Sequence, residues 1–482
     1  MYHKRMRLRP EPGLGRKGGT ACAAVLAGLA CLWMGAAACA PRRPVPASYA
    51  SAAEKMRDIG LCEEGAFTLL ARIAGVGPRL TGSPGAAAAV DLAVRMMREL
   101  GFENVRAEPV SVTRWVRGEK EEAEVLGAAS AEAALLHVCA LGGSDGTPGP
   151  GIAAPVAEVR SFEELDRLGP AARGKIVFFN RAMDRTQTDA FAAYGRAADQ
   201  RVRGAVEAAR HGAVAVLVRS LTFRVDDFPH TGLMTYEEGV PRIPAAAVST
   251  ADADRLSALL GKGGPVVVRL RMSCRTIGPA PSANVVGEIV GMERPRDIVL
   301  LGGHLDSWDL GVGAHDDGAG CAASLEALRL IRAAGLRPKR TVRAVLFMDE
   351  EFGGTGGRFY ASAVARAGER HLVVMESDRG GFMPVAIAAG QPGGPVLRRL
   401  RAWSALFEPL GVRTFVPGGG GVDVGPLVRS GSVPVAVIPD AQAYFDVHHS
   451  ALDILRSVHP RELEFQAVSM AILAYVLAEE GI

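Results

Sequence analysis

The sequence predicts an α/β protein: a mostly parallel mixed sheet flanked by helices, with a β-rich domain inserted into it. Three observations predict this fold. Apolar runs of strand length alternate with helical patterns after Pro279, and the chain looks helical from about Ser51 to Arg114. Between them, short β-like runs are separated by Gly and Pro. The 482 residues are enough for two domains and an export segment.

The alternation after Pro279 defines the main sheet. Strands that alternate with helices of ten or more residues favour parallel pairing, with helices covering the sheet. The expected strands are 284–290, 297–301, 342–348, 372–375 and 433–438. The expected helices are 318–334, 355–367, 396–410 and 460–479.

The chain before residue 276 is expected to contribute to two domains. Residues 51–117, with helical patterns at 64–73 and 86–100, should join residues 276–482 in the main domain. Residues 118–275 should form the smaller inserted domain. Its expected strands are 152–159, 175–179, 213–218, 245–248 and 266–270.

The N-terminus has the pattern of an export signal. A basic stretch precedes an apolar run from Ala21 to about Ala38, which ends in small residues before Cys39. We expect residues 1–39 to be a signal peptide. Three alternatives stay open: lipidation of Cys39, which would attach the chain to a membrane, plain cleavage, or an uncleaved anchor. The expected location is therefore periplasmic, membrane-anchored as a lipoprotein, or secreted.

The charge balance argues against a nucleic-acid partner. Residues 1–38 carry six Lys or Arg and one Glu, a net +5, so that removing them takes the formal charge from +3 to −2. The later cysteines do not indicate a cysteine-based zinc site, because they lack CxxC spacing, although one or two disulfides are allowed. They are Cys62, Cys139, Cys274 and Cys321.

Side chains of the metal-binding type follow the ends of the predicted strands. Each has an ordinary explanation by itself, such as a solvated loop carboxylate or a helix N-cap. Together they should meet at one sheet edge, because parallel strands place their carboxyl ends side by side. The mixture of His and carboxylate suits zinc. The residues are His304, Asp306, Asp316, Asp349, Glu350, Glu351, Glu376, Asp378, His448 and His449.

At these positions the sequence resembles the family of co-catalytic zinc aminopeptidases and glutamate carboxypeptidases. The resemblance covers nearly all of the chain after the signal, and five separate motifs occur in the family's order. The resemblance implies the zinc-peptidase fold with an inserted protease-associated domain, two Zn²⁺ per chain, a short peptide substrate and a homodimer. The five motifs are Gly303-His304-Leu305-Asp306-Ser307-Trp308-Asp309, Asp316-Asp317-Gly318, Glu350-Glu351, Met375-Glu376-Ser377-Asp378 and His448-His449-Ser450. Val76–Ser83, Gly204–Ala209 and His230-Thr231-Gly232 match as well.

The family's pattern implies a role for each candidate site residue. His304 and Asp378 would hold one zinc, Glu351 and His449 the other, and Asp316 would bridge both. Glu350 would be the general base that takes a proton from the metal-bridging water. His449 is preferred over His448 because the pattern places an acid, here Asp453, four residues after the ligand. The further candidates are Asp306 as a support of His304, His448 as an oxyanion stabiliser, and Asp423 and Tyr444 as contacts to the substrate termini.

The expected activity is hydrolysis of short peptides, with dipeptides the first candidates. An aminopeptidase acting on longer peptides is the alternative within enzymes. A receptor-like binding protein without catalysis is a second alternative, since the same superfamily contains the transferrin receptor, which lacks an intact zinc set. Single-zinc cyclisation of N-terminal glutamine is a third. The complete set of five ligands and Glu350 argues against the last two.

Overall fold

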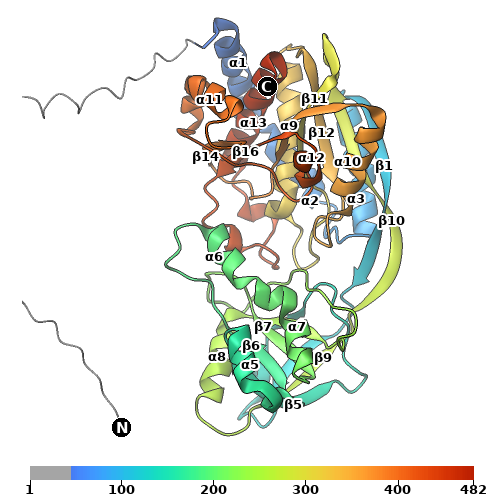
Figure 1. Cartoon of the computed structure of the whole chain (residues 1–482), viewed down its shortest axis with the longest axis vertical. Helices are drawn as coiled ribbons and strands as arrows, with labels where there is room; N and C mark the ends of the chain where they lie inside the picture. The colour runs from blue at the N-terminus through green and yellow to red at the C-terminus, as the bar shows by residue number, and fades with distance from the viewer. Residues whose placement is uncertain (1–44) are drawn as a thin grey trace, which may run out of the picture. The chain divides into compact units, whose positions relative to one another are not determined.

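The computed structural model describes residues 45–482, which form two eight-stranded sheets with helices packed on them (Figure 1). The predicted signal peptide, with Cys39, lies outside the described residues. Within 45–482 no helix is both long and apolar enough to cross a membrane. The four cysteines in this range are free thiols.

The first sheet has the strand order β1-β10-β12-β11-β13-β16-β14-β15. Its four central strands, β12, β11, β13 and β16, are parallel to one another, whereas the pairs β1–β10, β10–β12 and β14–β16 are antiparallel and β14–β15 is parallel. The strands are β1 (Glu103–Val116), β10 (Arg275–Ile289), β11 (Arg294–His304), β12 (Arg340–Phe347), β13 (Arg370–Glu376), β14 (Pro384–Ala389), β15 (Thr414–Val416) and β16 (Val433–Pro439).

Helices cover both faces of this sheet because its central strands are apolar on both sides. Val299 and Leu301 of β11 pack into the larger core beneath α9 and α13, whereas Ile298 and Leu300 pack beneath α10 and α12 on the opposite face. The helices of this part are α1 (Ala47–Glu63), α2 (Gly65–Ala74), α3 (Pro84–Glu99), α9 (Ala319–Ala333), α10 (Thr355–Ala367), α11 (Pro395–Ala402), α12 (Gly425–Arg429) and α13 (Pro460–Glu480). Short turns of helix are η2 (Ala314–Gly318), η3 (Ser404–Leu406), η4 (Glu408–Leu410), η5 (Tyr444–Asp446) and η6 (Leu455–Ser457).

The second sheet is an insertion between β1 and β10, which pair with each other over their length. Its order is β3-β2-β9-β5-β6-β7-β8-β4, and its two faces pack into separate cores. Its strands are β2 (Glu121–Val125), β3 (Leu135–Leu136), β4 (Val138–Ala140), β5 (Ile152–Val159), β6 (Ile176–Phe179), β7 (Ala215–Arg219), β8 (Ala245–Val248) and β9 (Val267–Met272). Its helices are α4 (Ala131–Ala134), α5 (Phe162–Leu168), η1 (Gly169–Ala172), α6 (Ala190–Ala197), α7 (Asp199–Arg210) and α8 (Thr250–Leu260).

The structure confirms the mixed α/β class and each expected strand, within a few residues at its ends except that β10 already begins at Arg275 and not at residue 284. The expectation of helix up to Arg114 was wrong, because Glu103–Val116 forms the long edge strand β1. The expected helix 396–410 ends at Ala402 and continues as two short 3₁₀ turns. Strands β14 and β15 had no counterpart among the predictions.

The N-terminal helices pack against two buried acidic side chains, Glu326 of α9 and Glu464 of α13. Glu326 forms two hydrogen bonds of 2.6 Å with Arg329, and Glu464 accepts one of 2.9 Å from the N–H of Ala66. A Cβ at Gly65 would come within 2.5 Å of the Glu326 carboxylate, so that the start of α2 has room only for glycine. Burial, reinforced by the neighbouring Glu326, raises the pKa of Glu464 to about 8.

Replacing Glu464 by Gln is expected to make the protein less sensitive to alkaline pH. In the folded state Glu464 keeps its proton up to a pKa of about 8, whereas in the unfolded chain it loses the proton near the ordinary glutamate pKa of 4.5. The folded state therefore binds more protons between these pH values, and wild-type stability falls as the pH rises through them. Melting curves at pH 5 and pH 9 should show the variant gaining several degrees relative to wild type at the higher pH. If the melting temperature changed equally in both proteins between pH 5 and pH 9, Glu464 would not be the group that makes the wild type sensitive to alkaline pH.

Candidate metal centre

Parallel strands bring the candidate ligands to one edge of the first sheet. β11 ends in His304, and β13 ends two residues before Asp378. β12 lies beside β11 and is followed by the turn that carries Glu350 and Glu351. Because these strands run in the same direction, the side chains leave the sheet at the same edge.

Asp316 lies at the centre of the site, in the single turn η2 that precedes α9. Its Oδ1 is 3.1 Å from Nε2 of His304, and that nitrogen is also 3.7 Å from Oδ1 of Asp378. Its Oδ2 is 3.1 Å from Nε2 of His449, which is 3.2 Å from Oε2 of Glu351. Burial alone would raise the pKa of Asp316, but the hydrogen bonds from His304 and His449 hold this pKa well below its ordinary value. One carboxylate thus faces two separate sets of metal-binding atoms, and the structure brings all five predicted ligands together.

The two adjacent histidines are placed differently. Nε2 of His449 contacts both Asp316 and Glu351, while Nε2 of His448 lies 3.5 Å from Asp316 alone. The His448 ring stacks on His449 with centroids 3.5 Å apart and packs edge-on against Tyr194 of α6. The geometry favours His449 as the ligand and puts His448 in the wall of the site.

Backbone carbonyls orient both candidate ligand histidines. Nδ1 of His304 is 3.0 Å from the carbonyl of Asp306, and Nδ1 of His449 is 3.3 Å from the carbonyl of Thr231. A proton on Nδ1 that is donated to a carbonyl leaves Nε2 free for a metal. Thr231 comes from the insertion, and its N–H also donates to the carbonyl of His449 at 2.9 Å. The His230-Thr231-Gly232 motif was visible in the sequence, but nothing in it indicated this contact.

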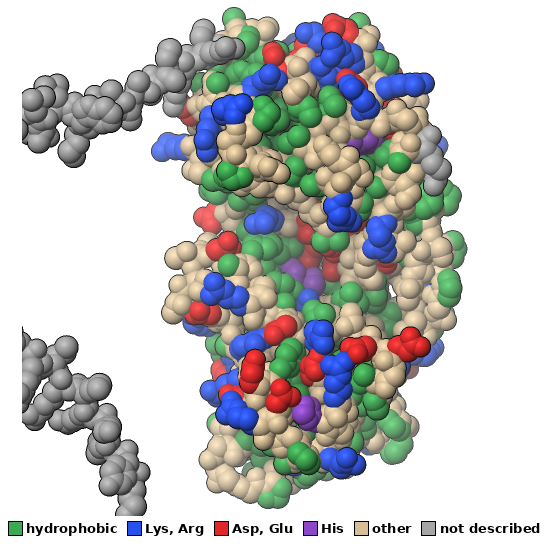
Figure 2. Space-filling view, in the orientation of Figure 1, with side chains coloured by type: hydrophobic (Ala, Val, Ile, Leu, Met, Phe, Trp, Pro, Cys, Tyr) green, Lys and Arg blue, Asp and Glu red, His purple; other side chains and the backbone are tan. Residues whose placement is uncertain are grey.

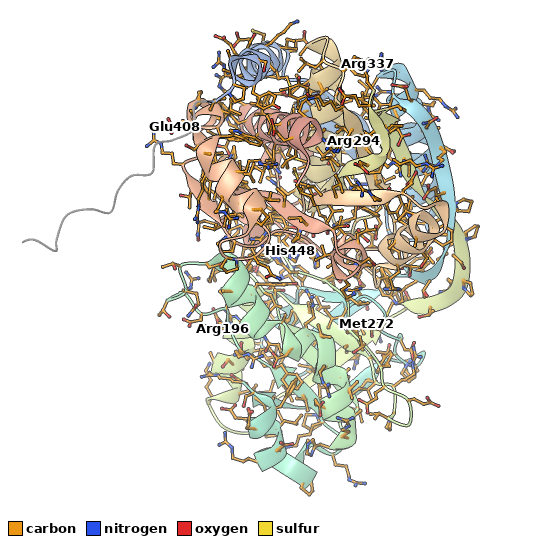
Figure 3. All side chains as sticks on the ribbon, turned by 45° about the horizontal axis from the view of Figure 1, so that its top comes forward. Arg196, Met272, Arg294, Arg337, Glu408 and His448 are labelled. Carbon is orange, nitrogen blue, oxygen red and sulfur yellow. The ribbon has the colours of Figure 1, made fainter. Side chains whose placement is uncertain are left out.

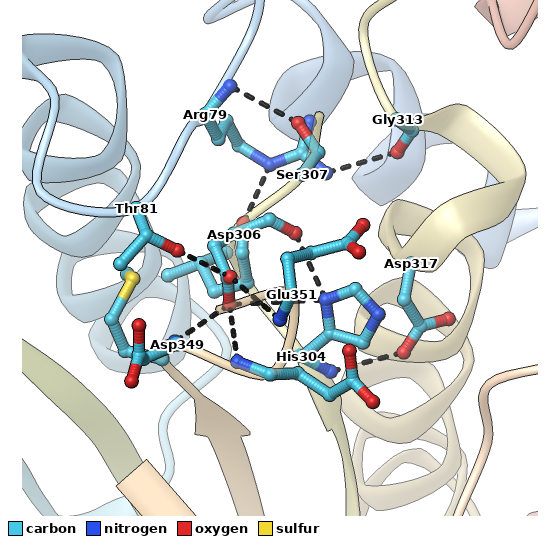
Figure 4. A network of polar contacts seen from close by, with 12 residues as sticks. Arg79, Thr81, His304, Asp306, Ser307, Gly313, Asp317, Asp349 and Glu351 are labelled. Atoms are coloured by element: carbon cyan, nitrogen blue, oxygen red, sulfur yellow. Dashed lines mark hydrogen bonds and ion pairs between the residues drawn. The ribbon is translucent and has the colours of Figure 1, made fainter. Parts of the chain in front are cut away.

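The carboxylate of Asp306 was predicted to contact His304, but it binds the turn after β12 instead (Figure 4). It lies 3.8 Å from Nδ1 of His304, farther than the backbone carbonyl of the same residue. It accepts hydrogen bonds from the N–H groups of Asp349 (2.8 Å), Glu350 (3.3 Å) and Glu351 (3.3 Å), and from the hydroxyl of Thr81 (2.7 Å). Asp306 thus fixes the turn that carries Glu350 and Glu351, and it contacts His304 through its main chain.

Replacing Asp306 by Asn is expected to lower the kcat/KM of the reaction at this site by about 10- to 100-fold, the usual cost of losing a group that supports metal ligands. The amide nitrogen of Asn would face main-chain N–H groups that need an acceptor. Thr81→Val removes one of the four hydrogen bonds and should cost less than the Asn variant. Kinetics and zinc content measured on the same samples check this, and wild-type kcat/KM in Asp306→Asn would contradict it.

Two further buried side chains hold the backbone around the site, and neither was predicted. The guanidinium of Arg79, 0% exposed, donates to the carbonyls of Leu305 (2.7 Å) and Gly313 (2.9 Å) (Figure 4). The carboxylate of Asp317 accepts from the N–H of His304 at 3.0 Å. Arg79 thereby connects the turn after α2 to the loop between β11 and η2. Its motif, Val76–Ser83, was the available sequence signal.

Asp453 supports the central aspartate more directly than it supports His449. Its two carboxylate oxygens accept from the N–H groups of His315 (2.7 Å) and Asp316 (3.1 Å). The acid that follows His449 by four residues therefore holds η2 in place.

The unbalanced negative charge of the site fits divalent cations. Asp316, Glu350, Glu351 and Asp378 lie close together, and none of them forms an ion pair with a Lys or Arg of residues 45–482. Oε1 of Glu351 is buried and has no hydrogen-bond partner among these residues. Burial, with Asp378 and Glu351 nearby, raises the pKa of Glu350 well above its ordinary value. Two His nitrogens and several carboxylates make the donor set that zinc prefers.

Of the two residues predicted to contact the substrate termini, only Tyr444 is exposed to the cavity. Tyr444 lines the cavity, and its hydroxyl lies 3.4 Å from Oδ1 of Asp378. Asp423 is completely buried and is not part of the cavity wall, and its neighbour Glu376 accepts from the N–H of Val424 at 2.8 Å. Contact between Asp423 and a substrate stays a prediction without geometric support.

The site opens into a cavity of about 320 Å³ that both parts of the chain enclose. Figure 2 shows His and acidic side chains inside a hollow on this face, and Figure 3 shows His448 between the insertion and the first sheet's domain. The wall from the first domain consists of Asp316, Glu350, Glu351, Asp378, Tyr444, Phe445, His448 and His449. The wall from the insertion consists of Phe191, Tyr194, Arg201, Val202 and Leu233.

Comparisons with known proteins identify the family and the relatives of the chain. The model of peptidase family M28 matches residues 284–476, which include all five candidate ligands and Glu350. Carboxypeptidase Q of Bos taurus is 39% identical over 405 residues, covering 84% of this chain and 83% of its own length. The human carboxypeptidase Q is 38% identical with the same coverage.

Solved structures show the same fold. A peptidase M28 precursor from Shewanella amazonensis superposes with a TM-score of 0.86 at 35% identity, covering 90% of this chain and 98% of its own. A zinc aminopeptidase from Bacillus subtilis shares the fold at a TM-score of 0.62 and 18% identity, covering 87% and 96%.

Proposed function

The chain belongs to peptidase family M28, a zinc-dependent metallo-exopeptidase family, and we propose that it is a di-zinc exopeptidase that hydrolyses short peptides, with dipeptides as preferred substrates. The observation that carries the proposal is the position of Asp316. Its two carboxylate oxygens face two sets of ligands, His304 with Asp378 and His449 with Glu351.

Each residue of the site is assigned a separate role in hydrolysis. When bound, two zinc ions supply an activated water and polarise the scissile carbonyl. Glu350 lines the cavity without being one of the five ligands, so that its carboxylate is free to take the proton of the attacking water and to return it to the leaving amine. Asp306 keeps Glu350 in place through the main-chain N–H at 3.3 Å. His448 and Tyr444 line the same wall, and we assign them contacts with the oxyanion and the substrate.

The size of the cavity supports a short substrate. Its volume of about 320 Å³ lies at the lower end of the range for small-molecule pockets, and aromatic side chains from both parts of the chain narrow it. Phe191 of α6 stacks on Tyr444 with centroids 5.4 Å apart, and Tyr194 stacks on Phe445 at 4.4 Å. The aromatic side chains of the insertion thus pack against those of the first domain beside the site. This contact limits the space for a substrate and favours short peptides over long ones.

The remaining assignments concern the context of the enzyme. We infer that residues 118–275 are the protease-associated domain, that the chain is exported through residues 1–39, and that it forms a homodimer. Lipidation of Cys39 would attach the enzyme to a membrane. Labelling of the full-length chain with a fatty acid, compared with Cys39→Ala, tests the attachment, and light scattering of the purified protein tests the dimer.

The test of function uses the chain from residue 40 onward. Zinc per chain is measured, and free dipeptides are compared with N-blocked peptides, C-terminal amides and longer peptides. About two zinc ions with selective cleavage of free dipeptides supports the proposal. Faster cleavage of longer peptides would establish an aminopeptidase acting on these instead, and zinc-free, inactive protein that zinc does not restore would reject catalysis.

A further inference from the structure

A buried ion pair joins the insertion to the loop after β11. Arg117 lies at the start of the insertion, directly after β1, and Asp309 lies between β11 and η2. Nε and Nη2 of Arg117 donate to Oδ1 of Asp309 at 2.9 Å and 2.6 Å. Arg117 is 9% exposed and the side chain of Asp309 is 20% exposed. Because the pair is largely shielded from water, the attraction between its charges is stronger than in a surface ion pair.

The remaining donors of Arg117 bind the part of the insertion that carries Thr231. Nη1 donates to the carbonyl of Ala140 and to Oε1 of Glu121, both at 2.8 Å. Nη2 lies 3.5 Å from the hydroxyl of Thr231, which itself donates to the carbonyl of Ala140 at 2.8 Å. All five N–H donors of the guanidinium are thus used, so that Arg117 holds the first domain and the insertion at one point.

The segment His230–Gly232 is bound to the loop that carries the two adjacent histidines. The N–H of Thr231 donates to the carbonyl of His449 at 2.9 Å, and the carbonyl of Thr231 is 3.3 Å from Nδ1 of the same histidine. Nδ1 of His230 lies 2.7 Å from the carbonyl of His448. The φ of His449 is +60°, a value that residues with a side chain rarely adopt, so that contacts from the insertion hold an unfavourable backbone conformation at a candidate ligand.

The neighbouring Trp308 adds a second contact between the same two segments. A Cβ at Gly142 would lie 1.8 Å from the ring of Trp308, so that the ring packs directly on the backbone of the insertion. The N–H of Gly142 donates to the carbonyl of Gly232 at 3.0 Å. The ring also lies beside the imidazole of His449, with centroids 5.6 Å apart. The loop after β11 therefore contacts the insertion at two points next to this histidine.

We propose that the ion pair between Arg117 and Asp309 sets the zinc affinity of the metal position to which His449 belongs. Both are positioning residues: neither is a candidate ligand, and they act through Thr231, whose carbonyl orients the imidazole of His449. Without the ion pair the insertion holds this carbonyl less firmly, and Nε2 of His449 is less well directed at the metal. The role rests on the proposed di-zinc function.

The other metal position should not depend on this ion pair. Its histidine, His304, is oriented by the carbonyl of Asp306, which belongs to the first domain. Its carboxylate, Asp378, follows β13 of the first sheet. Loss of the ion pair should therefore weaken one zinc ion and not the other, a result that a general loss of stability would not give.

The test measures both zinc dissociation constants by competition with a chelator. In Asp309→Ala one constant should rise about 10- to 100-fold, the usual cost of losing a group that supports a ligand. The other should change by about twofold at most, as for independent sites. His449→Ala identifies the position: adding Asp309→Ala to it should leave the affinity of the remaining zinc unchanged.

Two further variants separate positioning from charge. Arg117→Gln breaks the same ion pair from the insertion and should weaken the same zinc ion. It removes a positive charge, whereas Asp309→Ala removes a negative one, so that a common loss of affinity cannot come from the change of net charge. Arg269→Gln is the matched control, because Arg269 forms an ion pair of 2.7 Å with Glu124 inside the second sheet. It should leave both dissociation constants at the wild-type values.

Other outcomes overturn the proposal. Equal weakening of both zinc ions would give the ion pair a structural role only, and unchanged dissociation constants would remove it from metal binding. Should Asp309→Ala or Arg117→Gln fail to fold, as judged by melting curves, Asp309→Asn serves instead, with the same selective loss expected and the same two results against it. Wild type that binds a single zinc ion per chain would refute the di-zinc function itself, whatever the ion pair does.

Discussion

Replacing Glu350 by Gln is expected to lower kcat on dipeptides by about 10³-fold while the zinc content stays at the wild-type level. Gln has nearly the same shape but cannot take a proton from the attacking water or return it to the leaving amine. Glu350 is not one of the five candidate ligands, although it is adjacent to Glu351, so that its replacement should leave the metals bound. Substrate binding should change little, and the effect should therefore fall on kcat and not on KM.

Steady-state kinetics and metal analysis of the same preparation check this expectation. Glu119→Gln, at an exposed acid outside the cavity, is the control for a change of charge alone. A Glu350→Gln variant with kcat within tenfold of wild type would show that another group moves the proton. A variant that loses its zinc would show that Glu350 helps to bind metal.

The fold was predictable where the chain is apolar on both faces. β11 and β12 are completely or almost completely buried along their inner residues, so that each contains a short apolar run in the sequence, Ile298–Leu301 in β11 and Ala344–Phe347 in β12. β1 was missed because exposed and buried positions alternate along an edge strand rich in charged residues. Its partner β10 lies about 170 residues later in the chain, and no local pattern reports a pairing at that distance.

The site was predictable where the ligand is a side chain within a local motif. His304, Asp316 and Asp378 follow strand ends or open a helix, so that their positions could be inferred from neighbouring residues. The support of His449 could not, because it is the main-chain carbonyl of Thr231, 218 residues away. Every residue has a carbonyl, and the sequence does not mark the one that is used.

Asp306 shows the limit of spacing as an argument. Two residues after His304 it was expected to orient the imidazole with its carboxylate, and the spacing is compatible with a contact through either the side chain or the main chain. The distances decide between them, 3.0 Å for the carbonyl and 3.8 Å for the carboxylate. The side chain is engaged by three main-chain N–H groups that only the folded turn presents.

The insertion contributes more to the site than its sequence indicated. It supplies the carbonyl of Thr231, the glycine at 232, the cation of Arg201 and the aromatic wall of α6. None of these is a His, Asp or Glu side chain, so that the pattern of metal-binding residues in the sequence does not indicate them. On the proposed assignment the first domain carries the chemistry, whereas the insertion orients one candidate ligand and lines the substrate cavity.

Replacing Asp316 by Ala is expected to abolish activity, by more than about 10⁴-fold, because both metal positions lose a shared ligand. Zinc content should fall from about two per chain to well below one after dialysis. His304→Ala is the matched comparison, since it removes a ligand of one position only and should leave about one zinc bound. Among the described residues, His304 and His449 are the only positive groups paired with the buried carboxylates of Asp378 and Glu351. Bound zinc should therefore stabilise the folded protein, and the increase in melting temperature on adding zinc should be different in Asp316→Ala and in wild type.

The comparison of these two variants distinguishes a shared ligand from a single site. If Asp316 joins two ions, its loss must cost more zinc than the loss of His304, although both side chains lie 3.1 Å from each other. If the centre holds one ion, the two variants should lose the same amount of zinc, and the two sets of contacts around Asp316 would then have to serve different purposes. Equal zinc contents would therefore reject the di-zinc mechanism while leaving the family assignment untouched.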